Sequence, residues 1–318
     1  MARILTSRAL LLSVVATSSS PRPGFGPVLV ALGAMLWGTV GIASKTLYGI
    51  EDVPPLVVGF FRLALAVPLL AAWCWWRLGP ATFHFPGRDL FRIATLGVAM
   101  ALYQVFYFQA VALIGVALAT LITICSAPVL VGAAAVILLD EPVTRRIVTA
   151  LLIGLVGAGL LVGVPSDAGD PVGVLLALGS ALSYAVFVLC SRSLAHHDPG
   201  KIIVVGFGAG ALFLAPFALT TDVPFGTWSV SAWAALLYVG LVPTALAYLL
   251  YFRGMRDTPA TPASILALAE PLTATVLAFV LFDERLSLPA IIGAALLMLT
   301  MVILLRGSRR GKGTPEGN

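Results

Sequence analysis

The sequence predicts an all-α integral membrane protein of ten transmembrane helices, arranged as two inverted five-helix repeats around a central cavity. Three observations lead to this prediction: the composition, the spacing of the apolar runs, and an internal repeat at a fixed offset. Of the 318 residues, 60% are hydrophobic and 10% are charged, whereas a soluble domain carries about 25% charged residues. The polar side chains are too few to cover a globule of this size, so lipid must be the main solvent.

Ten apolar runs are long enough to cross a bilayer, which takes about 20 residues at about 1.5 Å each. The predicted spans are residues 27–47, 55–76, 92–113, 116–138, 147–164, 171–191, 202–220, 230–251, 260–282 and 288–305. Most connections are short and contain Pro, Gly, Asp or basic residues, as is typical of turns at a membrane edge. Only Ile114 and Gly115 separate the third span from the fourth. Because about 50 apolar residues cannot cross a bilayer once, we expect a turn near Gly115.

The Lys and Arg residues indicate the orientation of these spans. If the N-terminus is cytoplasmic, 16 of the 19 lie on the cytoplasmic side, Lys45 and Arg285 lie outside, and Arg62 lies within the second span. Cytoplasmic loops of membrane proteins are enriched in Lys and Arg. We therefore expect both termini in the cytoplasm, and one span more or fewer would disrupt this alternation.

Residues 1–26 precede the first span. Arg3 and Arg8 are followed by an apolar run over residues 9–16 and by a Thr/Ser-rich stretch, a pattern similar to a short signal peptide. Cleavage would leave the new N-terminus outside and would invert every later loop against the charge rule. We therefore interpret residues 1–26 as an uncleaved cytoplasmic N-terminal extension, or as an overextended start of the reading frame.

The net charge and the cysteines point to no further function class. The net charge of +5 follows from basic loops, and no polar segment is long enough to fold as a nucleic-acid-binding module. Cys74, Cys125 and Cys190 each lie inside an apolar run, as small core residues do, without the spacing of a disulfide or a metal site. No P-loop motif occurs, so this polypeptide does not consume ATP. We expect a monomer in a lipid bilayer that takes a small-molecule substrate and needs no cofactor or metal.

The two halves of the chain repeat each other at a fixed offset. Pro128 and Pro271 are 143 residues apart, and so are the acidic pairs Asp140-Glu141 and Asp283-Glu284. Each acidic pair begins 12 residues after its proline, at the end of an apolar run. Prolines and paired acids at one offset are improbable in unrelated helices, so we interpret the two halves as copies.

The repeat unit contains five predicted spans, an odd number. The second copy must therefore enter the membrane from the opposite side, which makes the repeats inverted. Upstream, residues 33–37 have a looser counterpart in residues 179–183, at an offset of 146. Inverted repeats underlie many secondary transporters, because two half-structures that exchange roles produce inward-open and outward-open states.

The motifs resemble those of the drug/metabolite transporter superfamily, and the EamA-type ten-helix branch is the most similar. The resemblance rests on Trp37-Gly38 in the first span, Arg62 in the second, and the proline-to-acid segments that close the fourth and ninth spans. It implies a first repeat over residues 27–164, a second, inverted repeat over 171–305 and a cytoplasmic tail over 306–318. The second repeat departs from the pattern, since Ser183-Tyr184 replaces the Trp-Gly pair.

The resemblance also implies a function. Most members of the branch that this chain resembles are similar to exporters of amino acids and related metabolites. Other members move riboflavin, purines, polyamines or toxic cations. We therefore expect an exporter of amino acids or related small metabolites in the bacterial cytoplasmic (inner) membrane, facilitated or proton-linked. Export or import of another metabolite or drug is the first alternative, and a membrane-embedded enzyme is the second.

Glu270 is the only carboxylate that falls well inside a predicted span, about ten residues from the start of the ninth. An ionised group near the bilayer centre costs at least about 2.5 kcal/mol on insertion scales, so such groups line a cavity or pair with a cation. Pro271 follows directly and removes a backbone donor, which leaves a carbonyl free to line the same cavity. We expect Glu270 to contact the substrate or a coupling proton; in the alternative it lies near the cytoplasmic edge.

Arg62 lies about two turns into the second span, counted from the outer side. Its guanidinium does not lose its charge, so it must reach the membrane surface or meet a carboxylate, a carbonyl or an anionic substrate. Substrate binding and a structural contact with Glu51 and Asp52 are equally compatible with the sequence.

Several polar-tipped side chains lie within the predicted spans and are candidate substrate-binding residues beside Glu270 and Arg62. They are Trp37, Tyr103, Gln104, Tyr107, Tyr184, Tyr248 and Tyr251. Tyr103 and Tyr107 share a helix face, because they are four residues apart. Aromatic rings with hydroxyl groups and an amide suit a zwitterion or a planar metabolite. The competing interpretation is the aromatic belt at the bilayer surface, which explains mid-span residues less well.

The enzyme alternative finds little support in the motifs. His196-His197-Asp198 is the only cluster with the character of metal ligands, and its place on a short loop before Pro199-Gly200 favours a solvated turn. No HExxH motif and no aspartate-rich motif occurs. We therefore expect no catalytic residues.

Overall fold

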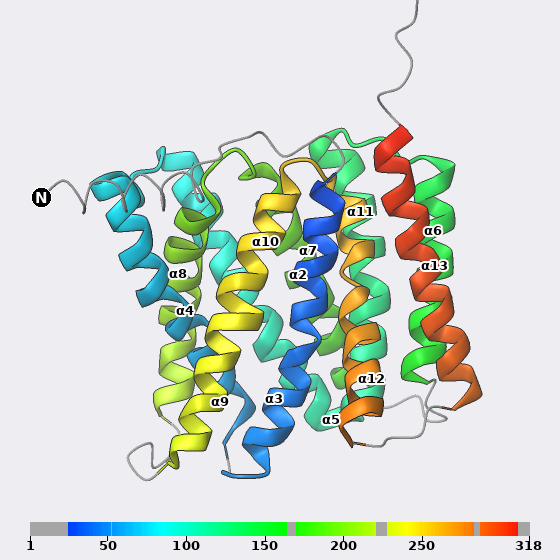
Figure 1. Ribbon diagram of the computed structural model, residues 1–318, viewed down its shortest axis with the longest axis horizontal. Helices are drawn as coiled ribbons and strands as arrows, with labels where there is room; N and C mark the ends of the chain where they lie inside the picture. The colour runs from blue at the N-terminus through cyan, green and yellow to red at the C-terminus, as the bar shows by residue number, and fades with distance from the viewer. Residues whose placement is uncertain (1–24, 52, 164–169, 221–227, 283–286, 311–318) are drawn as a thin grey trace, which may run out of the picture.

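The structure is a computed structural model that describes residues 25–51, 53–163, 170–220, 228–282 and 287–310, and over these residues the chain is helical, with no strand (Figure 1). The first repeat contains α2 (Gly26–Trp37), α3 (Thr39–Tyr48), α4 (Pro55–Leu78), η1 (Gly79–Phe83), α5 (Gly87–Leu139) and α6 (Arg145–Val162). The second repeat contains α7 (Pro171–Ser193), α8 (Pro199–Leu219), α9 (Val230–Gly240), η3 (Leu241–Leu246), α10 (Ala247–Met255), α11 (Ala260–Leu266), α12 (Ala269–Phe282) and α13 (Leu288–Arg310).

Nine helical segments among the described residues are long and apolar enough to cross a membrane. The longest, α5, has 53 residues and would measure about 80 Å if it were straight, against about 30 Å of hydrocarbon. Gly115 interrupts it with φ 75° and ψ 163°, a backbone conformation that only glycine adopts readily. The predicted turn is therefore confirmed, and α5 is two spans, which gives ten spans over the part of the chain that the structure describes.

Three other spans are broken at internal positions that the sequence analysis treated as continuous helix. The first span divides at Gly38 into α2 and α3, and the ninth divides at Ala267 and Leu268 into α11 and α12. The eighth contains a π-helical turn, η3, between α9 and α10. Broken helices free backbone groups, and at membrane depth these are tolerated only where protein or a cavity meets them.

The packing of the helices follows the two-fold relation between the repeats (Figure 1). Three pairs join a helix to its own counterpart in the other repeat: α4 with α8, α6 with α13, and α5 with α11. The contact between α5 and α7 has its counterpart in the contact between α2 and α10. These reciprocal pairs are those expected of two inverted repeats, because each helix meets the same neighbours from the opposite side of the membrane.

Large apolar side chains point away from the bundle along its whole circumference. Examples from four different helices are Ile137, Leu152, Leu212 and Val280, all of which are exposed. A soluble protein would cover such a surface, whereas a bilayer accepts it. The chain is therefore a multi-pass membrane protein.

One end of the bundle, at the top in Figure 1, carries the start of α2, the ends of α4, α10 and α13, and the loop between α7 and α8. We call it the basic end, because most described Arg residues lie there. Glu141 of the first acidic pair connects three elements at this end. Its Oε1 accepts a hydrogen bond of 2.8 Å from the backbone N of Ala260 at the start of α11, and Nε of Arg192 lies 3.4 Å from Oε1. The second acidic pair, Asp283-Glu284, lies outside the described residues.

Candidate functional site

A small cavity of about 40 Å³ lies between the two repeats. It is lined by α5 of the first repeat and by α7, α11 and α12 of the second. The lining residues are Tyr103, Thr123, Ile124, Ala127, Pro128, Tyr184, Ser264, Ala267, Leu268, Glu270 and Pro271. Three of the sequence-predicted site residues, Tyr103, Tyr184 and Glu270, therefore meet at one cavity.

The two repeated prolines both line the cavity. Proline has no N–H, so Pro128 cannot bond to the carbonyl of Ile124, nor Pro271 to that of Ala267. All four residues line the cavity. The 143-residue offset thus relates Ile124 to Ala267 and Pro128 to Pro271. Each repeat therefore contributes one weakened helix turn to the lining of the same cavity.

Glu270 lies in the first turn of α12, directly after the break at Ala267 and Leu268. It is ten residues into its span, or about 15 Å from the start at 1.5 Å per residue. The backbone N of Glu270 donates to the carbonyl of Ala267 at 3.0 Å. The start of a helix favours a negative charge. Glu270 thus lies at mid-depth, against the alternative that placed it near the membrane edge.

Gly38 allows the break between α2 and α3 to pack closely against the first turn of α12. A methyl group on Gly38 would lie 2.6 Å from the carbonyl oxygen of Glu270 and 2.8 Å from Cβ of Thr273. Only glycine permits so close an approach. The Trp37-Gly38 pair therefore places the break in the first span against the break in the ninth.

A continuous row of aromatic rings runs from the cavity into the core of the second repeat. Centroid distances are 6.2 Å for Tyr107–Tyr103, 5.8 Å for Tyr103–Tyr184 and 6.0 Å for Tyr184–Phe187. From Phe187 the row continues to Tyr248 at 5.7 Å and to Tyr251 at 6.0 Å, and Trp37 packs on these two at 4.8 and 5.0 Å. These spacings are those of favourable aromatic pairs.

Three polar atoms in this row are buried without a hydrogen-bond partner among the described residues. They are Nε1 of Trp37 and the hydroxyl oxygens of Tyr184 and Tyr251. The last two lie near each other, but they do not meet hydrogen-bond geometry. A buried group without a partner costs about 1–3 kcal/mol. Of these residues Tyr184 lines the cavity, so its hydroxyl indicates a place where water or a ligand supplies the missing partner.

Arg62 of α4 extends to the π-helical turn η3. Its Nε donates to Oγ1 of Thr244 at 3.0 Å, and that hydroxyl donates to the carbonyl of Val239 at 2.8 Å. Glu51, one of the two acids considered as its partner, instead accepts a hydrogen bond from the backbone N of Ser229 at 3.0 Å; Asp52 lies outside the described residues. Arg62 lies within electrostatic range of Glu270 and Tyr248.

The other six predicted residues do not line the cavity: Trp37, Tyr251 and Arg62, described above, and also Gln104, Tyr107 and Tyr248. Gln104 is buried against Gly59 of α4, and its Nε2 donates to the carbonyl of Met100 at 3.5 Å. The Tyr248 hydroxyl meets Sδ of Met100 at 3.6 Å. Tyr107 exchanges a hydrogen bond of 2.6 Å with Thr120 across the turn at Gly115. Gln104 and Tyr248 therefore pack in the interior, and Tyr107 extends the aromatic row beyond the cavity.

Several residues of the site were not predicted from the sequence, and three of them bear on its chemistry or its connection to the core. Phe187 connects the cavity to the aromatic core and is fully buried; its position three residues after Tyr184, on the same helix face, was the available signal. Thr123 and Ser264 line the cavity, and their hydroxyls donate to the carbonyls of Ala177 at 3.2 Å and Thr261 at 2.8 Å. No pattern distinguished these two from other small polar residues in the spans.

Inverted repeats, discontinuous helices and a cavity at mid-depth with a carboxylate in its wall define a membrane transport protein. The chain belongs to the EamA-like transporter family, whose model matches residues 24–163 and again 171–306.

Relatives of this chain include the uncharacterized transporter YwfM of Bacillus subtilis, which is 32% identical over 90% of this chain and 95% of its own length. An uncharacterized transporter of Archaeoglobus fulgidus is 31% identical over 89% and 97%, and the uncharacterized inner membrane transporter YicL of Salmonella typhimurium is 27% identical over 92% and 98%. A crystal structure at 22% identity superposes with a TM-score of 0.77, covering 91% of this chain and 99% of that one. At that identity it shows the fold alone.

Proposed function

We propose that this transporter works by alternating access and exports amino acids or related small metabolites across the bacterial cytoplasmic membrane, by a facilitated or proton-linked route. The observation that carries the proposal is the position of Glu270, at mid-depth in a cavity between two inverted repeats. A site between repeats is accessible from one side at a time when one repeat moves against the other.

The size of the cavity supports a moving mechanism over an open pore. At about 40 Å³ it has room for a few water molecules, whereas sites for small molecules measure about 300–1,000 Å³. A substrate must therefore separate the helices before it binds. The proline-weakened turns at Pro128 and Pro271 lie where that separation is needed.

The charges near the cavity support a zwitterionic substrate. Glu270 supplies a carboxylate for an ammonium group, and Arg62, within electrostatic range of it, supplies a cation for a carboxylate. The hydroxyl of the cavity-lining Tyr184, which has no partner among the described residues, adds hydrogen-bonding capacity. An amino acid offers both charges and a side chain for the aromatic row, whereas a purely cationic drug would use Glu270 but not the positive charge of Arg62.

The test is flux in proteoliposomes that contain the purified protein and labelled amino acids, with and without a proton gradient. We expect Glu270→Gln to reduce flux at least about thirtyfold, because loss of one partner of a buried charge pair costs about 2–5 kcal/mol. Asp257→Asn is the matched control, since Asp257 is exposed at the end of α10. Dependence of the wild-type flux on the gradient distinguishes proton-linked from facilitated transport.

Two results would contradict the proposal. Unchanged flux and unchanged pH dependence in Glu270→Gln would remove Glu270 from the mechanism. Flux of purines, polyamines, riboflavin or toxic cations without flux of amino acids would replace the substrate class and keep the carrier.

We also propose that the basic end of the bundle faces the cytoplasm, with both termini on that side. The support is the excess of Lys and Arg, 16 against 2, in the loops assigned to it. Labelling of single cysteines in intact cells tests the orientation. A cysteine that replaces the exposed Arg253 at the basic end should be protected from an impermeant reagent. A cysteine that replaces the exposed Ser231 at the opposite end should be labelled.

A further inference from the structure

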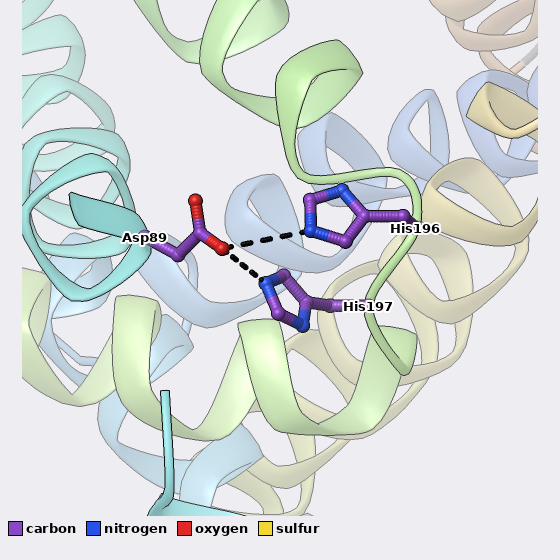
Figure 2. Close-up of side chains that lie close together, drawn as sticks. All are labelled: Asp89, His196 and His197. Atoms are coloured by element: carbon purple, nitrogen blue, oxygen red, sulfur yellow. Dashed lines mark hydrogen bonds and ion pairs between the residues drawn. The ribbon is translucent and has the colours of Figure 1, made fainter. Parts of the chain in front are cut away.

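A second cluster of side chains that could bind a ligand lies at the basic end, and none of its members lines the central cavity (Figure 2). Asp89 belongs to the first turn of α5, and His196 and His197 lie on the loop between α7 and α8. Figure 2 shows both imidazole rings directed at the same carboxylate. Nε2 of His197 lies 2.9 Å from Oδ2 of Asp89, and Nε2 of His196 lies 3.5 Å from the same atom.

This arrangement corrects the interpretation of His196-His197-Asp198 as one solvated turn. Asp198 has another role: its Oδ1 accepts from the backbone N of Gly200 at 2.9 Å and caps α8, while Oδ2 lies 3.8 Å from Arg77. The third member of the cluster is Asp89, 108 residues before His197 in the sequence. Spacing in the sequence could not reveal a residue that the fold brings from the other repeat.

The distances fit a single small metal ion. Zn²⁺ binds imidazole nitrogen and carboxylate oxygen at about 2.0–2.2 Å, and tetrahedral angles then separate neighbouring ligand atoms by about 3.3 Å. The separations of Oδ2 from the two imidazole nitrogens, 2.9 and 3.5 Å, lie on either side of this value. The two nitrogens lie within 4.8 Å of each other, and a rotation of the exposed His196 side chain would bring them to the tetrahedral spacing. Two imidazoles and one carboxylate form a donor set that suits Zn²⁺ and its neighbours, with a fourth position left for water.

The groups behind the ligands hold them in place. Nη1 of Arg92 lies 3.1 Å from Oδ1 of Asp89, which orients the carboxylate and leaves Oδ2 directed at the histidines. Arg256 fixes the histidine loop from the second repeat: its Nε donates to the carbonyl of Ala195 at 3.1 Å and its Nη2 to that of His197 at 2.9 Å. Partners of this kind orient metal ligands and tune their affinity.

An ion can also reach the cluster. The side chains of Asp89 and His197 are 12% and 16% exposed, whereas that of His196 is 59% exposed. His196 therefore lies at the entrance and the other two at the base. A ligand set, fitting distances, supporting partners and an entry path together are what a metal site requires.

We propose that Oδ2 of Asp89 and Nε2 of His196 and His197 bind one divalent transition-metal ion of the Zn²⁺ type at the basic end. Each imidazole coordinates in the tautomer that carries its proton on Nδ1. The ion joins α5 of the first repeat to the α7–α8 loop of the second, so it restrains the motion of one repeat against the other. The alternative is a metal-free hydrogen-bonded network of Asp89, His197 and Arg92.

The experiment uses the full chain purified through a tag without histidine, and it measures Zn²⁺ affinity by competition with a chromophoric chelator. The chain has three histidines, which supplies a matched control: His84 also lies at the basic end, outside the cluster. We expect one Zn²⁺ per chain in the wild type and in His84→Ala, and at least tenfold weaker binding in His196→Ala and in Asp89→Asn. Because the His196 side chain is mostly exposed, its removal leaves the fold intact.

A second measurement reports the geometry. Co²⁺ in place of Zn²⁺ should give the intense visible absorption of a tetrahedral site in the wild type and in His84→Ala, but not in His196→Ala. Zn²⁺ should also raise the melting temperature of the wild type and leave that of His196→Ala unchanged, since a ligand stabilises only the state that binds it. Absence of stoichiometric binding in the wild type would overturn the proposal, as would equal affinity in His196→Ala and the wild type. Either result would leave the metal-free network as the role of the cluster.

Discussion

The two repeats share the framework of the cavity but differ in which of them carries its charge. Ile124 and Pro128 line it from the first repeat, and Ala267 and Pro271 line it from the second, at the same 143-residue offset. The position between them is Ala127 in the first repeat and Glu270 in the second. The framework that must open from both sides is thus symmetric, whereas the charge is present once. The position at which the two repeats differ, Ala127 against Glu270, therefore indicates the site of substrate binding better than the positions that they share.

A second difference concerns the first helix of each repeat. The looser offset of 146 relates Gly38 to Tyr184. Gly38 lacks a side chain because α2 and α3 pack directly on the backbone of Glu270. Tyr184 instead has a large side chain that lines the cavity. Backbone contact from one repeat and a side chain from the other make a single, asymmetric site from two related halves.

The largest expected effect comes from moving the acid to the other repeat. Glu270→Ala should lose at least about thirtyfold in flux, since a buried charge partner is worth about 2–5 kcal/mol. If the cavity wall is symmetric, the double variant Ala127→Glu/Glu270→Ala should regain at least about tenfold over the single variant. Ala127→Glu alone should lower flux, because two carboxylates in one small cavity repel each other. Proteoliposome flux at equal protein density measures all three.

A double variant no better than Glu270→Ala would break the comparison. It would show that a carboxylate in the cavity is not sufficient, and that it must also lie in the first turn of α12, where the start of the helix favours a negative charge. Thermal unfolding of each variant in detergent checks that the cavity still forms.

The next effect concerns Arg62. One variant removes its charge and another removes its hydrogen-bond partner, so the two separate the role of the charge from the role of its position. We expect Arg62→Gln to reach the membrane and to transport at least about tenfold less, because its charge acts on the cavity. Thr244→Val removes the hydroxyl that binds Nε of Arg62 but keeps the charge, so it should cost about 1 kcal/mol of stability and less than about threefold in flux. Membrane abundance by immunoblot accompanies the flux measurement. Failure of Arg62→Gln to accumulate would assign Arg62 to the fold.

Hydropathy and charge were sufficient for the framework. The predicted span 230–251 corresponds to Val230–Met255, and the turn inferred from length alone lies at Gly115. These features follow from the thickness of the bilayer and the cost of placing charge in it. Both constraints appear directly in the sequence, as the length of the apolar runs and the positions of the charged residues. The prediction of Glu270 had the same origin, because one acid in an apolar run is visible without a structure.

The breaks within spans could not be predicted in this way. The division at Ala267 and Leu268 and the π-helical turn η3 depend on which backbone groups meet a cavity or an Arg side chain, and these are tertiary contacts. Gln104 shows the same limit: its amide is polar and mid-span, but Gly59 makes room for it between α5 and α4. A polar residue in a span is a site residue only if the fold turns it toward the cavity.

A smaller effect is expected where the first repeat packs on Glu270. A methyl group on Gly38 would lie 2.6 Å from the Glu270 carbonyl, so Gly38→Ala should lower the free energy of unfolding by about 1–3 kcal/mol, the usual cost of overpacking. Gly41→Ala, one turn further along α3, meets nothing within 4 Å and should be neutral or stabilising by up to about 1 kcal/mol. Thermal unfolding in detergent compares them. Equal stability of the two variants would mean that α2 and α3 do not press on the start of α12.

The smallest effect distinguishes the two ends of the aromatic row. Tyr107→Phe loses a hydrogen bond of 2.6 Å to Thr120 and should cost about 1 kcal/mol of stability. Tyr184→Phe removes a hydroxyl that has no partner among the described residues, so stability should stay constant or rise slightly, while flux should fall a few-fold because the substrate loses a hydrogen bond. The two variants thus exchange their effects: one changes the melting temperature and the other the rate. A fall in melting temperature for Tyr184→Phe without a change in flux would mean that this hydroxyl serves packing, and the asymmetry of the site would then rest on Glu270 alone.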